Sequence, residues 1–171
     1  MAEVAVLYLD DLYAGQRFKS GTYLMDETRI KEFALEFDPQ PFHLGESAAQ
    51  ASVFKGLAAS GWHTAAVAMR LLVTGGLPFV NGIVGLGGEI SWPRPTRPGD
   101  LLRVESEIVE ITPSRSKPQQ GVVTVRMLNQ NGEAFTFSTR RFWYGNIRCD
   151  LRAPRKEMEH APRKTGTSQL A

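Results

Sequence analysis

The residues best suited to chemistry in this sequence are an acid and a histidine, Asp38 and His43. Pro39 and Pro41 lie between them, end a preceding helical pattern, and predict a stiff, extended turn. A carboxylate and an imidazole held in such a turn can share one water molecule, which is the arrangement that general acid–base catalysis needs. The alternative is that both are ordinary polar side chains of a solvated loop.

The hexapeptide Asp38–His43, DPQPFH, resembles the D-x-N-P-x-H signature of the MaoC-like, (R)-specific enoyl-CoA hydratases. Two later segments resemble the same family in the same order. Residues 56–61, GLAASG, are similar to the turn that opens the family's central helix, and residues 93–100, PRPTRPGD, are similar to its R-P-V-R-P-G-D strand entry. The resemblance covers about residues 8–145. Gln40 replaces the signature's Asn, and Ser60 replaces the His of the helix-opening turn.

The resemblance implies a hydro-lyase that reversibly adds water to a trans-2-enoyl thioester of coenzyme A. Asp38 and His43 would bind the water, one taking its proton and the other delivering a proton to C2 of the substrate. The N–H of Gly61, at a helix start, would stabilise the charge that develops on the thioester oxygen. We expect the substrate to be bound by Gln40, Ser60, Gly61 and Trp62. No cofactor is expected, because coenzyme A is part of the substrate.

Several of these residues also have a simpler interpretation. Serine at a helix start is usually a cap, and no base is close to Ser60 in the sequence, so we do not expect a nucleophile there. Trp62 would line the acyl pocket or, equally well, fill the core. His63 beside it is more typical of a structural hydrogen-bonding group than of a substrate contact.

The length and composition describe one soluble domain. The chain has 171 residues, a net charge of +2, one cysteine (Cys149) and three scattered histidines. These features predict no disulfide, no metal site, and neither a nucleic acid nor a membrane as partner. The single cysteine favours a reducing cytoplasm, and residues 1–9 do not resemble a signal peptide. We assign residues 1–145 to a MaoC-like hot-dog domain and 146–171 to a basic polar tail, either solvated or near the anionic end of coenzyme A.

Hydrophobic periodicity predicts the elements that position these residues. A strand is expected over 17–24, followed by a helix that Asp26 caps and Pro39 ends, with Ile30, Phe33, Ala34 and Phe37 on one face. Residues 44–52 predict a short helix. A second main helix is expected over 62–73, with an apolar face formed by Trp62, Ala65, Ala66, Met69, Leu72 and Val73.

The second half of the chain predicts antiparallel strands over 83–92, 101–111, 121–128 and 133–144. The alternation in the second of these slips by one residue at Val109, as a β-bulge would cause. Asn131-Gly132 predicts a hairpin turn. Together with the helices, this is an α+β pattern: the hot-dog fold, in which an antiparallel sheet wraps around a central helix. Pairing of exposed sheet edges predicts a homodimer, or a dimer of dimers.

Two other functions remain open at this point. A hot-dog acyl-CoA thioesterase would direct water at the thioester carbonyl, and a non-catalytic dimer would only bind acyl-CoA. The presence of both Asp38 and His43 favours the hydratase.

Overall fold

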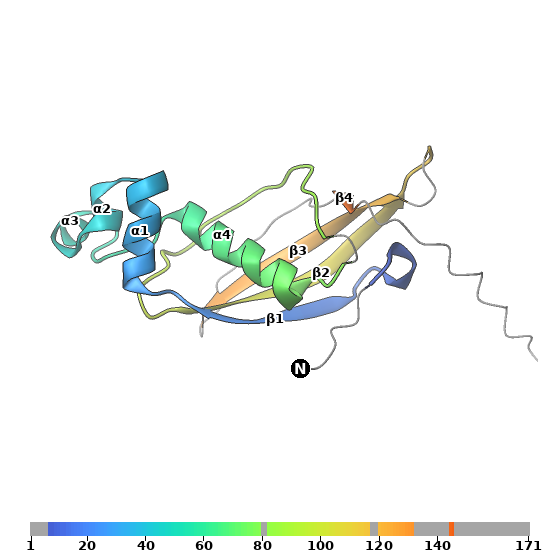
Figure 1. Ribbon diagram of the computed structural model, residues 1–171, viewed down its shortest axis with the longest axis horizontal. Helices are drawn as coiled ribbons and strands as arrows, with labels where there is room; N and C mark the ends of the chain where they lie inside the picture. The colour runs from blue at the N-terminus through green and yellow to red at the C-terminus, as the bar shows by residue number, and fades with distance from the viewer. Residues whose placement is uncertain (1–6, 80–81, 117–119, 132–143, 146–171) are drawn as a thin grey trace, which may run out of the picture.

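The protein consists of a long antiparallel sheet with one helix, α4, lying along it and the helices α1, α2 and α3 at one end (Figure 1). The computed structural model describes residues 7–79, 82–116, 120–131 and 144–145. In chain order, the elements are the 3-10 turn η1 (Leu9–Asp11), β1 (Arg17–Leu24), α1 (Glu27–Phe37), α2 (Pro41–Leu44), α3 (Glu46–Ala51), α4 (Gly61–Leu71), the π-helical turn η2 (Leu72–Gly76), β2 (Leu101–Pro113), β3 (Gly121–Asn131) and β4 (Tyr144–Gly145).

The four described strands pair in the order β1-β2-β3-β4, all antiparallel. In β2, Leu102, Val104, Ser106 and Ile108 point into the core. The register against β3 then shifts between Ile108 and Glu110, so the bulge predicted at Val109 is confirmed. The alternation of apolar side chains was therefore sufficient to locate this irregularity.

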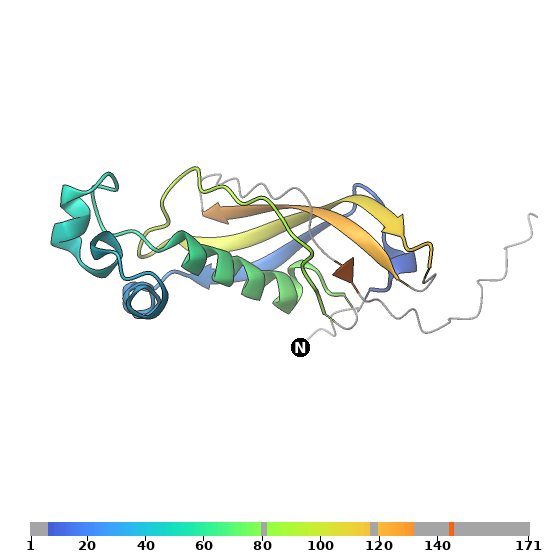
Figure 2. The ribbon, with the colours of Figure 1, turned by 90° about the horizontal axis from the view of Figure 1, so that it is seen from above.

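Helix α4 lies along the sheet, as Figure 2 shows from above. It buries the face formed by His63, Thr64, Val67, Ala68 and Leu71. The predicted apolar face was wrong for Trp62, Met69 and Val73, which are 60%, 37% and 51% exposed, although Leu72 of the same set is fully buried. Apolar residues occur on both sides of this helix. The buried side also contains the polar residues His63 and Thr64, so the sequence pattern did not identify it as the buried one.

Helix α1 begins and ends where the sequence predicted. The Asp26 side chain caps it by accepting a hydrogen bond from the N–H of Arg29 at 3.1 Å. Ile30 and Ala34 are fully buried, whereas Phe37 on the predicted apolar face is 63% exposed. Burial of these two core residues fixes the end of α1, which is where the chain reaches Asp38.

The turn after α1 is extended only as far as Gln40 and becomes helical at Pro41, which corrects the prediction. Pro41 opens the single turn α2, where its fixed φ suits the first helical position. Gln40, before it, keeps the extended conformation that a following proline imposes. The predicted helix over 44–52 accordingly begins only at Glu46, as α3, after a break at Gly45.

The strand predicted over 83–92 does not form; the chain there is extended, with a single bridge residue at Val84. Gly87 adopts a φ of +151°, which interrupts strand geometry, and Gly85 and Gly88 add no side chains to pack. Residues 82–100 instead run back to the start of α4 and then enter β2 (Figure 1). The predicted hairpin at 131–132, most of the strand over 133–144, and the tail 146–171 lie outside the described residues.

Candidate active site

The Asp38 carboxylate is held in place by two hydrogen bonds. Asp38 is the C-cap of α1, and its Oδ2 accepts from the Ser60 hydroxyl at 2.6 Å, while its Oδ1 accepts from Gln40 Nε2 at 2.7 Å. Burial raises the pKa of Asp38, but the hydrogen bonds from Ser60 and Gln40 and the nearby His43 together lower it below its usual value. The side chain is therefore a carboxylate at neutral pH.

The ring of His43 is buried and fixed by a backbone carbonyl. Its Nδ1 lies 2.7 Å from the carbonyl oxygen of Ala58. Because a carbonyl oxygen only accepts hydrogen bonds, Nδ1 must carry the proton, and the neutral ring presents a bare Nε2. This Nε2 lies 3.4 Å from Asp38 Oδ2. Two acceptors thus face each other, and a water molecule donating one hydrogen to each would satisfy both.

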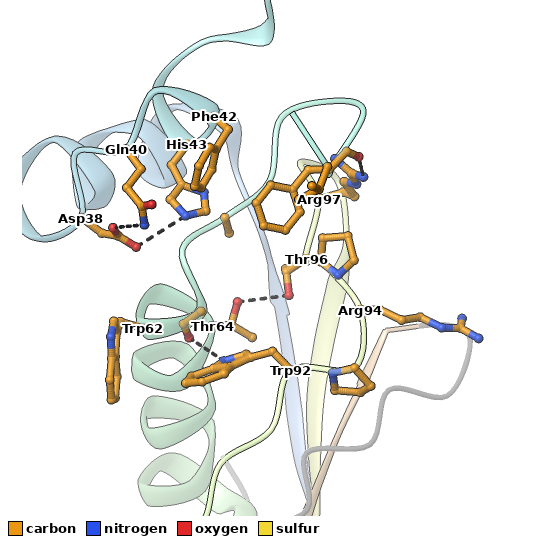
Figure 3. A pocket seen from close by; sticks show the side chains of 16 residues that line it. Asp38, Gln40, Phe42, His43, Trp62, Thr64, Trp92, Arg94, Thr96 and Arg97 are labelled. Carbon is orange, nitrogen blue, oxygen red and sulfur yellow. Dashed lines mark hydrogen bonds and ion pairs between the residues drawn. The ribbon is translucent and has the colours of Figure 1, made fainter. Parts of the chain in front are cut away.

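A cavity of about 690 Å³ opens beside this pair (Figure 3). Aromatic side chains form much of its wall, and polar ones lie at defined points. The aromatic lining residues are Phe42, Phe54, Trp62 and Trp92, and the polar ones are Asp38, Gln40, His43, Thr64, Arg94, Thr96 and Arg97. The hydroxyls of Thr64 and Thr96 are hydrogen-bonded to each other at 3.1 Å. The cavity can accept a largely apolar group and bring it against the Asp38–His43 pair.

Gly61 is the first residue of α4, and it lines the cavity. The Ser60 hydroxyl accepts a hydrogen bond from the N–H of Trp62 at 3.2 Å. The N–H of Gly61, at the first position of the helix, has no acceptor within the helix. The indole of Trp92 lies directly against Gly61, donating from Nε1 to its carbonyl at 3.0 Å. A Cβ added at Gly61 would lie 2.8 Å from this indole. Glycine is therefore required for the close approach of Trp92.

The structure places the six predicted site residues around one region, but in different positions. Asp38, Gln40, His43, Gly61 and Trp62 line the cavity, whereas Ser60 is fully buried behind it. Ser60 caps α4, as expected, and also donates to Asp38. Trp62 is 60% exposed, so the core interpretation of this residue was wrong.

Sequence reasoning missed Phe54, Trp92, Thr96 and Arg97 as cavity residues. Trp92 was assigned to a strand from the sequence. The proline-rich segment 93–98 that follows it was a signal that this strand could not continue past Trp92. Arg97 lies in a segment that was used only for the family resemblance. Its side chain reaches residues about forty positions earlier, and no local pattern reports such a contact.

His63 is a buried histidine of α4 that the cavity does not include. Its ring stacks on Phe33, with ring centroids 4.7 Å apart, and its Nδ1 has no hydrogen-bond partner among the described residues. Burial, and to a lesser degree the charge of Arg29, lowers the pKa of His63 below its usual value. The packing of His63 on Phe33 therefore agrees with a structural role, but within the described part of the chain its Nδ1 does not make the hydrogen bond that such a role predicted.

We expect acid to destabilise the protein through His63. The unfolded chain binds a proton near pH 6.5 and the folded chain only at lower pH, so the free energy of unfolding should fall as the pH drops below about 6.5. His63→Phe removes this titration and should show a smaller fall. Thermal melts of both proteins between pH 5 and 8 measure it, and identical pH dependence would contradict the assignment.

The described part of the chain contains neither a metal-binding cluster nor a membrane-spanning helix. No group of three or more His, Cys, Asp or Glu side chains there could hold a metal ion. None of the helices in the described ranges is both long and apolar enough to cross a membrane.

Comparison with known proteins gives consistent matches. The family model for a MaoC-like domain matches residues 13–131. The uncharacterized protein YdeM of Bacillus subtilis is 32% identical over 124 residues, which are 72% of this chain and 86% of YdeM. The crystal structure of a MaoC-like dehydratase from Rhodospirillum rubrum is 51% identical with a TM-score of 0.81, covering 85% of this chain and 99% of that one.

The unliganded R-hydratase PhaJ1 from Pseudomonas aeruginosa is also similar in structure. It is 26% identical with a TM-score of 0.61, covering 80% of this chain and 84% of that one. Together with the antiparallel sheet along α4, these matches confirm the predicted α+β hot-dog fold.

Proposed function

The chain belongs to the family of MaoC-like domains, and from this premise we propose that it is an enoyl-CoA hydratase and 3-hydroxyacyl-CoA dehydratase. The observation that carries the proposal is the pair of acceptors, Asp38 Oδ2 and His43 Nε2, facing each other across 3.4 Å beside an aromatic-lined cavity. Such a pair binds the two hydrogens of one water and leaves an oxygen lone pair free to attack.

The proton balance of the reaction follows from the tautomer of His43. As the water oxygen bonds to C3 of the enoyl thioester, Nε2 takes one of its protons, and the electrons of the C2–C3 double bond move toward the carbonyl oxygen. The carboxylate of Asp38 holds the second hydrogen and stabilises the imidazolium. Nε2–H then delivers its proton to C2 on the same face. Dehydration is the reverse sequence.

The developing charge on the thioester oxygen needs a hydrogen-bond donor, and we propose the N–H of Gly61 for this role. Its N–H is one of the free donors at the start of α4, where the helix dipole adds partial positive charge. Gln40 orients the carboxylate of Asp38 through its 2.7 Å hydrogen bond. Ser60 acts on the same carboxylate from behind, so we now assign it to positioning rather than to substrate contact.

The substrate is proposed to be an acyl-CoA thioester. The aromatic residues Phe42, Phe54 and Trp62 suit the acyl portion, and the cationic side chain of Arg94 contributes positive charge to the cavity lining for the anionic coenzyme A. The nucleotide is thereby part of the substrate, and the proposed reaction needs no further cofactor.

The proposal is tested with crotonyl-CoA and a panel of longer, branched, carboxylated and aromatic enoyl-CoA thioesters. We expect a loss of enoyl absorbance without release of free thiol. Thiol release would instead identify a thioesterase. Binding of the thioesters without either change would identify a non-catalytic acyl-CoA-binding protein, and both results would overturn the hydratase.

We also propose a homodimer, because several large apolar side chains are exposed. Trp62 and Val73 on and after α4, and Leu86 on the extended segment that follows, are 60%, 51% and 64% exposed. Large apolar side chains that are exposed in a single chain can be covered at a subunit interface. A second copy of the chain would cover them and extend the sheet.

The assembly prediction concerns these exposed apolar residues. Light scattering should give twice the chain mass of 19.0 kDa at micromolar concentration, or four times for a dimer of dimers. Leu86→Lys places a charge in the proposed interface and should shift the protein toward monomer. Tyr13→Lys is the control, because Tyr13 is equally exposed, at 64%, but lies in the loop before β1. A stable wild-type monomer would contradict the prediction.

A further inference from the structure

Arg97 holds the loop that precedes α4. Its guanidinium group donates to three backbone carbonyls of this loop: Nη1 to Gly56 at 2.5 Å and to Leu57 at 3.0 Å, and Nη2 to Phe54. The backbone N–H of Arg97 is itself bound to Asp100 Oδ2 at 2.7 Å. A rigid, planar fork of donors is suited to binding several carbonyls at once.

The loop needs such support because its backbone is unusual. Lys55 has a φ of +53°, a value that residues other than glycine rarely adopt, and Gly56 has a φ of +145°. Conformations of this kind persist only where the surroundings impose them. In addition, Glu46 Oε2 accepts a hydrogen bond from the N–H of Leu57 at 3.0 Å. Arg97 and Glu46 thus hold the loop through its carbonyls and through an amide, respectively.

The held loop leads directly to the carbonyl that fixes His43. Ala58 follows Leu57, and its oxygen lies 2.7 Å from His43 Nδ1. The Phe54 ring of the same loop packs near the His43 ring, with centroids 5.9 Å apart. If the Ala58 carbonyl moved away, Asp38 would become the strongest acceptor near the ring, and its carboxylate would favour the proton on Nε2 instead.

We propose that Arg97 is a positioning residue that sets the tautomer of His43. Through the loop, it keeps the proton on Nδ1 and leaves Nε2 bare toward Asp38. In the other tautomer, Nε2 already carries a proton and cannot take one from water. The effect on turnover rests on the proposed hydratase function; the effect on the tautomer does not.

The test uses protein labelled with ¹⁵N in its three histidines, His43, His63 and His160. The ¹⁵N shifts of the two ring nitrogens report which one carries the proton, and a His43→Asn sample assigns the signals of His43. We expect wild-type His43 to carry its proton on Nδ1. In Arg97→Gln, the share of the Nε2–H form should rise, and kcat for an enoyl-CoA should fall by about 100-fold, the scale of a misplaced catalytic group.

Arg97→Lys keeps the positive charge but cannot bind three carbonyls together, so it should show the same changes to a smaller degree. It also tests the inference if Arg97→Gln does not fold. Arg17→Gln is the matched control, because this arginine lies on β1 with a 75% exposed side chain and binds only Glu107 among the ion pairs described. It should leave both the tautomer and kcat unchanged.

An unchanged His43 tautomer in the Arg97 variants would overturn the inference, whatever happens to turnover. A changed tautomer in a protein whose wild type does not hydrate any enoyl-CoA would leave the inference standing and reject the proposed function. The two failures are therefore distinguishable.

Discussion

Asp38→Asn should lower kcat by about 10²–10⁴-fold, because it removes the negative charge that stabilises the imidazolium, and His43→Ala should lower it by a similar factor, because it removes the Nε2 that takes the proton. The double variant should lose little more than either single one, because the two groups act as a unit. Asparagine retains the shape of Asp38 and an oxygen that can accept from Ser60, so the fold should survive. Single-turnover rates with an enoyl-CoA measure the effect.

The control for Asp38→Asn is Glu36→Gln, which removes the same charge from an exposed position two residues earlier on α1. It should retain wild-type kcat. Near-normal turnover in either Asp38→Asn or His43→Ala would refute the catalytic pair. A loss in both that merely follows a lowered melting temperature would show that the residues are structural.

Gly61→Val should reduce the rate by the equivalent of about 2.7–4 kcal/mol, the loss measured when comparable oxyanion donors are removed. The added side chain would stand where the thioester carbonyl must approach the N–H of Gly61. The structure adds a second consequence: even a Cβ lies 2.8 Å from the Trp92 indole, which would have to move. The same substitution therefore disturbs both the donor and one cavity wall.

A second set of variants separates these two effects. Trp92→Ala removes the indole and leaves the N–H of Gly61 open, and Gly61→Ala in that background adds a Cβ without the clash. If the donor matters, Gly61→Ala should still lower kcat when Trp92 is absent. If glycine only makes room for Trp92, the double variant should equal Trp92→Ala in kcat, with the cost of Gly61→Ala alone appearing as a lower melting temperature.

Local rules were sufficient for much of the fold and for bringing Asp38 and His43 together. The Asp26 cap, the end of α1 before Pro39, and the bulge at Val109 each depend on neighbouring residues, and the structure confirms all three. Asp38 and His43 are five positions apart, so the chain itself brings them near each other. The sequence could therefore place them together, although it predicted an extended turn where Pro41 begins a helical one.

The remaining features depend on contacts between distant segments. Which side of α4 is buried is decided by the sheet, because apolar side chains occur on both sides of this helix. The contact of Trp92 with Gly61 spans 31 positions, and that of Arg97 with the Phe54 carbonyl spans 43. No periodicity within a segment encodes such pairs.

The most direct test of the central claim is the stereochemistry of hydration in D₂O. If one water held between Asp38 and His43 supplies both the hydroxyl at C3 and the proton at C2, the two must add to the same face of the double bond. The 3-hydroxyacyl product from a trans-2-enoyl-CoA should then contain a single deuterium at C2, syn to the hydroxyl, as read from its proton coupling constants. Anti addition, or deuterium on both faces of C2 at the earliest times, would contradict the account.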